Sequence, residues 1–235
     1  MTLSGGRAPL SPDRIGRFTQ PVPDDVAYVE PYHRRLRGQV GGRTVIDSER
    51  ALLIHRPAWP WYVLAFPPED VDDSVPSKPD PDAPGYVRVR WDAIESWLEE
   101  DEPVVGHLKN PYHRVDCLRS SRRIEVRVDD TVLVDTDRTV LLLETSLVPR
   151  LYVATDDVRM DLLTPSDTTT YCSYKGVASY WNATVDGTVV PDVAWSYENP
   201  LPTSGCEAIR GRLSFTLDAP GLLIAAELPP GSTAA

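Results

Sequence analysis

Short segments of alternating apolar and polar residues, joined by two-residue turns, constrain the fold of this chain most strongly. The segments form three pairs, and each pair flanks a turn at Gly41-Gly42, Asp129-Asp130 or Asp186-Gly187: 36–40 with 43–46, 124–128 with 131–134, and 181–185 with 188–190. Such dipeptides accept the positive φ that a tight turn requires, and they connect neighbouring antiparallel strands. The pattern predicts three β-hairpins in a chain built mainly of antiparallel strands.

Helix signals are few. The chain has 23 prolines, roughly twice the usual share, and proline interrupts helices. Residues 155–163 begin with a capping threonine and acidic residues, and Pro165 blocks their extension. Residues 92–95 resemble a capping box. We expect a mainly β fold with one or two short helices.

The two halves of the chain are similar to each other. Residues 47–54 parallel residues 135–142, offset by 88, and residues 85–92 parallel residues 211–218, offset by 126. The larger second offset means that the first copy lacks a segment, about residues 165–207, that the second copy keeps. The sequence predicts three parts: a flexible leader over 1–29, a truncated first repeat over 30–108 and a complete second repeat over 119–228.

Three segments carry a family resemblance: residues 91–102, 110–116 and 166–197. Together they make the chain resemble a two-repeat member of the bacterial domain-of-unknown-function 427 family, over about residues 32–218. The resemblance implies a compact β fold akin to the β-tent group, so both modules are expected to be β-tent-like. It implies no reaction, because the family has none assigned.

Composition narrows the class of protein. The formal net charge is −11 without a basic block, which disfavours nucleic-acid binding. No apolar run approaches the roughly 18 residues of a membrane span, and the first residues lack the apolar stretch of a secretory signal. Three dispersed cysteines make no disulfide framework. We expect an acidic, cytoplasmic protein with reduced thiols, and the sequence leaves its oligomeric state open.

Lys175 and Cys172 are the candidate catalytic residues. Lys175 is the only lysine of the second repeat and lies between aromatic residues. It could bind an anion or, if desolvated, act as a base or Schiff-base amine; alternatively, it pairs with a carboxylate in a loop. A nearby cation would lower the pKa of the Cys172 thiol; alternatively, Cys172 is a small buried residue.

Aromatic and polar residues near this motif are the candidates for ligand binding. In a regular strand Trp195 and Tyr197 share a face, and Tyr180 and Trp181 could lie opposite them. Such a wall describes either a small-molecule pocket or an ordinary core between sheets. Arg150 either pairs with Glu144 or holds a ligand carboxylate. The predicted ligand-binding residues are Tyr171, Tyr180, Asp192, Trp195, Glu144 and Arg150.

No metal site or cofactor is predicted. The four histidines are dispersed, and residues 31–34 and 111–114, which echo each other as Pro-Tyr-His-Arg, are interpreted as linkers entering each repeat. Two functions therefore remain open. In the first, the second repeat has a small-molecule site, with or without enzymatic activity. In the second, it is a non-catalytic binding or protein-interaction module, and the same residues only shape the fold.

Overall fold

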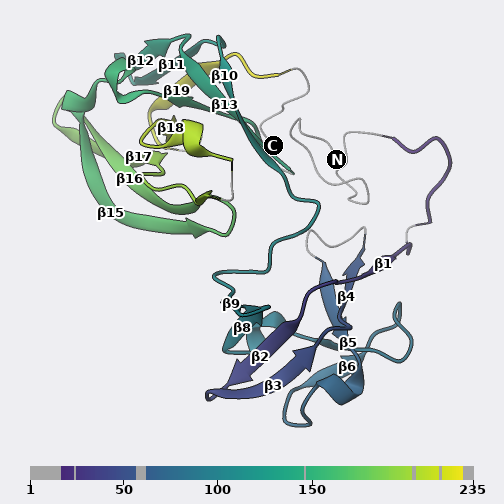
Figure 1. Cartoon of the computed structure of the whole chain (residues 1–235). Coiled ribbons are helices and arrows are strands. Elements are labelled where there is room, and N and C mark those ends of the chain that lie inside the picture. The colour runs from purple at the N-terminus through teal and green to yellow at the C-terminus, as the bar shows by residue number, and fades with distance from the viewer. Residues whose placement is uncertain are drawn as a thin grey trace. The chain divides into compact units, whose positions relative to one another are not determined.

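The computed structural model describes residues 17–229, except 24, 57–61, 146, 203–204 and 217–218 (Figure 1). The prediction of a mainly β chain is confirmed, because the described residues form antiparallel sheets joined by loops and short turns. Their contacts divide them into an N-terminal unit, residues 17–110, and a C-terminal unit, residues 111–229. Most of the predicted leader, residues 1–16 and 24, lies outside the described residues.

The N-terminal unit contains two sheets. The order of the first is β1-β4-β5-β7-β6, formed by Tyr28–Pro31, Leu52–His55, Val63–Phe66, Val87–Val89 and Ser77–Pro79. The order of the second is β3-β2-β8-β9, formed by Arg43–Ser48, Leu36–Val40, Ser96–Glu99 and Glu102–Pro103. Alternation along each strand turns one side chain in two inward. Leu36 and Ile46 from one sheet and Leu53 and Phe66 from the other therefore share one core.

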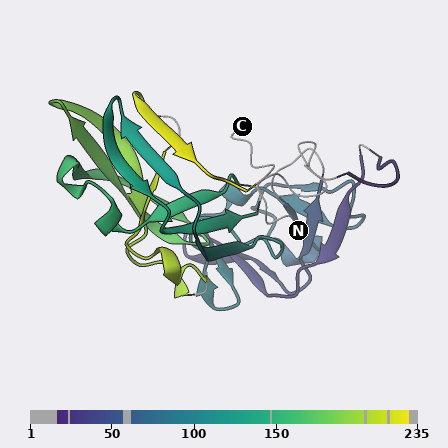
Figure 2. The same cartoon turned by 90° about the horizontal axis from the view of Figure 1, so that it is seen from above.

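The C-terminal unit also contains two sheets. The larger has the order β10-β13-β14-β18-β17-β16-β15, formed by Val115–Ser120, Thr139–Glu144, Arg150–Val153, Leu213–Phe215, Thr188–Ser196, Gly176–Val185 and Leu163–Cys172. The smaller has the order β12-β11-β19, formed by Thr131–Thr136, Ile124–Val128 and Leu222–Ala226. Figure 2 shows β19, in yellow, beside the teal β11 with which it pairs. Val126, Val153 and Val193 are fully buried in the core of this unit.

The same strand order occurs in both units. The run β1-β4-β5-β7 corresponds to β10-β13-β14-β18, and β3-β2-β8 corresponds to β12-β11-β19. The two large sheets differ after this point. The C-terminal sheet continues through the long strands β17, β16 and β15, whereas the N-terminal sheet ends at the three-residue strand β6.

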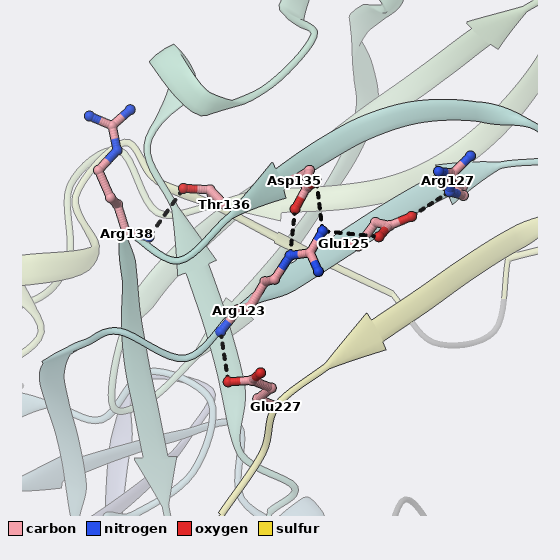
Figure 3. Close-up of polar contacts among 7 residues, drawn as sticks. All are labelled: Arg123, Glu125, Arg127, Asp135, Thr136, Arg138 and Glu227. Carbon is pink, nitrogen blue, oxygen red and sulfur yellow. Dashed lines mark hydrogen bonds and ion pairs between the residues drawn. The ribbon is translucent and has the colours of Figure 1, made fainter.

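One polar contact recurs in the first hairpin of each unit. Arg123 precedes β11 and donates from Nε and Nη2 to the two carboxylate oxygens of Asp135 on β12, at 2.8 Å each (Figure 3). Arg35 binds Asp47 in the same two-pronged way, at 2.7 and 2.6 Å. Each arginine thus joins the beginning of one strand to the end of its partner.

The three predicted hairpins are confirmed as β2–β3, β11–β12 and β16–β17. Asp186 and Gly187, which connect β16 to β17, have φ values of +48° and +77°. Both residues therefore have the positive φ that a type I′ turn requires.

The predicted short helices are single 3-10 turns in the structure. Thr155–Asp157 and Met160–Leu162 form two turns in place of one helix, and Trp91–Ala93 forms another. The segment is divided because the Arg159 amide donates to the Leu133 carbonyl at 2.9 Å and Val158 bridges Val134. These contacts to a strand replace helical hydrogen bonds. Among the described residues, no helical segment has the length and apolar character needed to cross a membrane.

Candidate functional site

One face of the seven-stranded sheet gathers most of the predicted site residues. We call it the aromatic face and define it by seven residues. Six lie on β13, β14, β17, β16 and β15, and Tyr197 directly follows β17: Glu144, Arg150, Tyr152, Trp195, Tyr180, Cys172 and Tyr197. Alternation along the strands explains the grouping, because side chains two residues apart point to the same side of a sheet. Four of the six predicted ligand-binding residues belong to this face.

Lys175 lies in the turn between β15 and β16, where its backbone amide donates to the Cys172 carbonyl at 3.2 Å. Its amine donates to Glu144 in an ion pair, and the two side chains are only 8% and 4% exposed. The following residue, Gly176, has a φ of +100°, which side-chain-bearing residues rarely adopt. This turn therefore directs the lysine inward, against the end of β13.

His113 completes a buried network around Glu144. Its Nε2 lies 3.0 Å from the second carboxylate oxygen of Glu144. The imidazole stacks on the Tyr174 ring, with 3.8 Å between ring centroids and 17° between planes. Burial raises the pKa of Glu144, but the hydrogen bond from His113 and the charge of Lys175 outweigh burial and hold that pKa below its ordinary value. Glu144 is therefore ionised at neutral pH.

Trp195 is the centre of the aromatic contacts. Its Nε1 donates to the Tyr152 hydroxyl at 2.9 Å, and these two rings meet edge to face. The Tyr180 ring lies on another side, 6.4 Å away between centroids. The Arg150 guanidinium lies 5.4 Å from the centroid of the Trp195 ring, within the range of a cation–π contact.

Two tyrosines of this face are held as neutral phenols. Tyr152 is 1% exposed and Tyr197 is 5% exposed. Burial is the largest cause that raises the pKa of each hydroxyl above its ordinary value. Lys175 also lies over the Tyr197 ring, with its amine 5.9 Å from the centroid. The lysine is therefore enclosed by a carboxylate on one side and an aromatic ring on another.

All three cysteines belong to the same apolar cluster beneath this face, although they are dispersed in the sequence. None forms a disulfide. A hydrogen bond with Cys206, and then burial, raise the pKa of the Cys117 thiol. Cys117 is therefore a neutral thiol at physiological pH. No cluster of three or more metal-ligating side chains occurs in the described part of the chain.

Two predicted ligand-binding residues lie away from these contacts. Tyr171 is 43% exposed, and as the neighbour of Cys172 in a strand it points to the opposite side of the sheet. Asp192 accepts a hydrogen bond from Thr168 at 2.8 Å, and its amide donates to Asn182 at 2.9 Å. Its φ is +51°, so Asp192 belongs to the irregularity of the β16–β17 hairpin.

The structure adds His113, Tyr152 and the Cys117–Cys206 pair to the residues predicted from the sequence. The sequence carried one signal for His113, because it lies in the recurring Pro-Tyr-His-Arg motif that was interpreted as a linker. The corresponding His33 is exposed. Both units therefore contain the Pro-Tyr-His-Arg motif, but the exposed His33 does not have the buried position of His113 beside a glutamate.

Comparison with known proteins gives one finding for the C-terminal unit. Residues 116–222 match the model of a family described as Domain of unknown function (DUF427). The matched segment runs from β10 to the first residue of β19 and includes the whole aromatic face. No curated protein matches the chain. The match is to a single domain and not to a two-repeat architecture, and it supports the family resemblance for the C-terminal unit, which is similar to the DUF427 family.

Proposed function

We propose that the C-terminal unit binds a small anionic molecule with a flat ring on the aromatic face. The observation that carries the proposal is the position of Arg150, which is half-buried with its guanidinium over the Trp195 ring. A guanidinium presents parallel donors that suit a carboxylate or phosphate. The neighbouring Tyr180 and Trp195 rings offer surfaces on which a flat ligand can stack.

The charge of the region favours an anion. The side chains of Lys175 and His113 both contact the Glu144 carboxylate, and the guanidinium of Arg150 belongs to the same face. These groups occur in a chain whose formal net charge is −11. A cationic site in an acidic protein concentrates the field on a ligand of opposite charge. The guanidinium of Arg150 would therefore attract an anionic ligand to this face.

Stability alone gives a weak reason for burying these charges. Removing two ions from water costs several kcal/mol each, and apolar side chains of similar size often stabilise a protein as well or better. Titratable groups held in such an environment are candidates for a functional site. We accordingly propose that the buried network of Lys175, Glu144 and His113 has a fixed position and helps to orient a bound ligand.

The geometry favours binding over covalent catalysis by Lys175. An amine that attacks a carbonyl must be able to reach it, whereas the Lys175 amine is buried in an ion pair with Glu144. Lys175 is therefore proposed as a binding and positioning charge. Cys172, half-buried at the end of β15, is proposed to line the same site.

Benzoate and its neutral counterpart benzamide test the proposal directly. Ligand-observed NMR titrations would compare the wild type with Arg150→Met, and Arg159→Met would serve as the control, because it removes an exposed arginine beside the smaller sheet. We expect benzoate to bind in the millimolar range, with about tenfold weaker binding to Arg150→Met and unchanged binding to Arg159→Met. Benzamide should bind more weakly than benzoate.

Equal binding of the two compounds, or benzoate binding that is insensitive to Arg150→Met, would contradict the proposal. The alternative, a non-catalytic interaction module, would then be favoured. That module predicts that Lys175→Met leaves partner binding intact.

We also propose that the N-terminal unit is a shortened copy of the C-terminal domain. The common strand order and the recurring Arg–Asp contact support this origin. Crystal structures of the chain would test it by superposition. Failure of Arg35 and Asp47 to superpose on Arg123 and Asp135 would contradict a common origin.

A further inference from the structure

The N-terminal unit contains a cavity of about 890 Å³. All the residues that line it belong to this unit, so it is separate from the site proposed in the C-terminal unit. It lies at one end of the five-stranded sheet, where β5 and β6 begin and β7 ends. Its wall is largely apolar, and the residues that form the apolar part are Tyr62, Val63, Leu64, Pro76, Val89, Trp91 and Leu108. A cavity of this size falls within the range of small-molecule sites.

The two large sheets differ in the strand that borders this cavity. Ser77 on β6 pairs with Val89 on β7, as Ala194 on β17 pairs with Phe215 on β18. In the C-terminal unit, β17 extends for several residues before Ala194, and its Val193 is fully buried in the core. In the N-terminal unit, β6 begins at Ser77 itself. The strand beside the cavity is therefore shorter than its counterpart, and Pro76, at the position of Val193, lines the cavity.

One wall of the cavity is rigid. The Trp91 ring stacks on the Trp97 ring, with 4.8 Å between centroids and 7° between planes. The Trp97 indole also donates to the Trp91 carbonyl at 3.2 Å. A preformed flat surface reduces the entropy that a ligand loses on binding. Trp91 therefore offers a fixed platform for the apolar body of a ligand.

Basic residues form the polar part of the wall. Four of them line the cavity, Arg56, Lys78, Arg88 and Arg90, whereas Asp92 is the only acidic residue among the described lining residues. Arg56 is held by Asp80 and Asp82, and Arg90 is held by Asp92. Lys78 and Arg88 have no acidic partner among the described residues.

Lys78 and Arg88 also face each other. They are direct partners in the register of β6 and β7, so their side chains leave the same face of the sheet. Like charges in such cross-strand positions destabilise a sheet. An anionic group placed between the two side chains would remove that repulsion.

We propose that this cavity binds an amphipathic anion, with its apolar body against Trp91 and its acidic group between Lys78 and Arg88. The expected ligand class is an apolar molecule of two or three rings that ends in a carboxylate or sulfonate. The cavity lies within the N-terminal unit. The proposal is therefore independent of the anion site proposed for the C-terminal unit.

A matched pair of dyes tests the proposal on the full chain. 1-Anilinonaphthalene-8-sulfonate has an apolar ring system with a sulfonate, and N-phenyl-1-naphthylamine has the same ring system without it. Fluorescence titrations would compare the wild type with Lys78→Met, Arg88→Met and the double variant. Arg119→Met in the other unit would control for loss of one positive charge, and thermal melts would show that each variant is folded.

We expect the sulfonate dye to bind about tenfold more weakly to Lys78→Met and to Arg88→Met, and the neutral dye to bind these two variants, the double variant and the wild type equally. Ser77→Trp, an exposed rim position that lines the cavity, should weaken binding of both dyes by occupying the entrance. Sulfonate binding that is unchanged in the double variant would overturn the anion site. If Ser77→Trp leaves the binding of both dyes unchanged, the cavity is not their binding site.

Discussion

Lys175 and Glu144, 31 residues apart in the sequence, form an ion pair that is almost completely closed to solvent. The amine lies in the turn between β15, the edge strand of the seven-stranded sheet, and β16. The carboxylate ends β13, which lies four positions from β16 in the sheet order. His113 holds the other oxygen of the same carboxylate. The pair therefore joins two distant parts of the C-terminal unit through one buried charge network.

Glu144→Gln should destabilise the protein by about 3–5 kcal/mol, because it leaves the Lys175 ammonium buried without its counter-charge. Lys175→Met should cost less, since His113 still donates to Glu144. Urea unfolding of both single variants and the double variant measures the coupling. The double variant is expected to lose less unfolding free energy than the sum of the losses in the two single variants. Strict additivity would show that the two side chains act independently.

Arg159→Met, which removes an exposed ion pair with Asp161, is the control and should leave the unfolding midpoint unchanged.

The stability contributed by Glu144 should depend on pH in one direction. Its folded-state pKa lies below the ordinary value of 4.5, so the unfolded chain takes up the proton first as the pH falls. This contribution is fully present above pH 4.5 and is lost as the pH falls through the folded-state pKa. The difference in unfolding free energy between wild type and Glu144→Gln should therefore be constant from pH 8 to 5 and should shrink below pH 4.5. A difference that grows on acidification would contradict the assignment.

The cysteines should differ in reactivity. Cys206 is fully buried, and the thiol pKa of Cys117 is raised by its contact with Cys206. Since the thiolate is the reactive form, both should resist iodoacetamide at pH 8, whereas the half-buried Cys172 reacts first. Mass spectrometry of the labelled peptides measures the order, and labelling in urea should modify all three. Faster labelling of Cys117 than of Cys172 would refute the expected order.

Gly176→Ala should destabilise the protein more than Gly187→Ala. Both glycines have positive φ, at +100° and +77°. A Cβ on Gly187 meets no atom within 4 Å, whereas a Cβ on Gly176 meets the Asn199 carbonyl and the Leu201 side chain at 3.4 Å. The Gly187 variant isolates the cost of the left-handed backbone, about 1–2 kcal/mol. Thermal unfolding that ranks the two variants in the reverse order would show that the turn at Lys175 relaxes freely.

The hairpins were predictable because their signals are local. The Asp186-Gly187 turn and the strands beside it are encoded within a few residues, and the structure follows them. The helix predicted at 155–163 was also inferred from local signals, but Arg159 and Val158 bind the strand that contains Leu133 and Val134. A long-range backbone contact of this kind is not visible in a short window of sequence.

The alternation of side chains along a strand explains why the structure does not place some of the predicted site residues together. Tyr171 and Cys172 are neighbours in one strand, so they cannot line the same wall. Trp181 likewise packs on the core opposite to its neighbour Tyr180. This alternation was available from the sequence, whereas the meeting of Lys175 with Glu144 depends on strand order across the sheet. That order is fixed by pairing between distant segments.

The outer strand of the large sheet has a consequence for how copies of this chain meet in solution. β15 is ten residues long and ends the sheet, and an open edge of that length is a template for pairing with a second molecule. Pro165 lacks an amide donor, and the register of β15 against β16 shifts between Pro165 and Thr169. Because this interruption leaves only short stretches of regular backbone, we expect β15 to pair poorly with the edge of a second molecule.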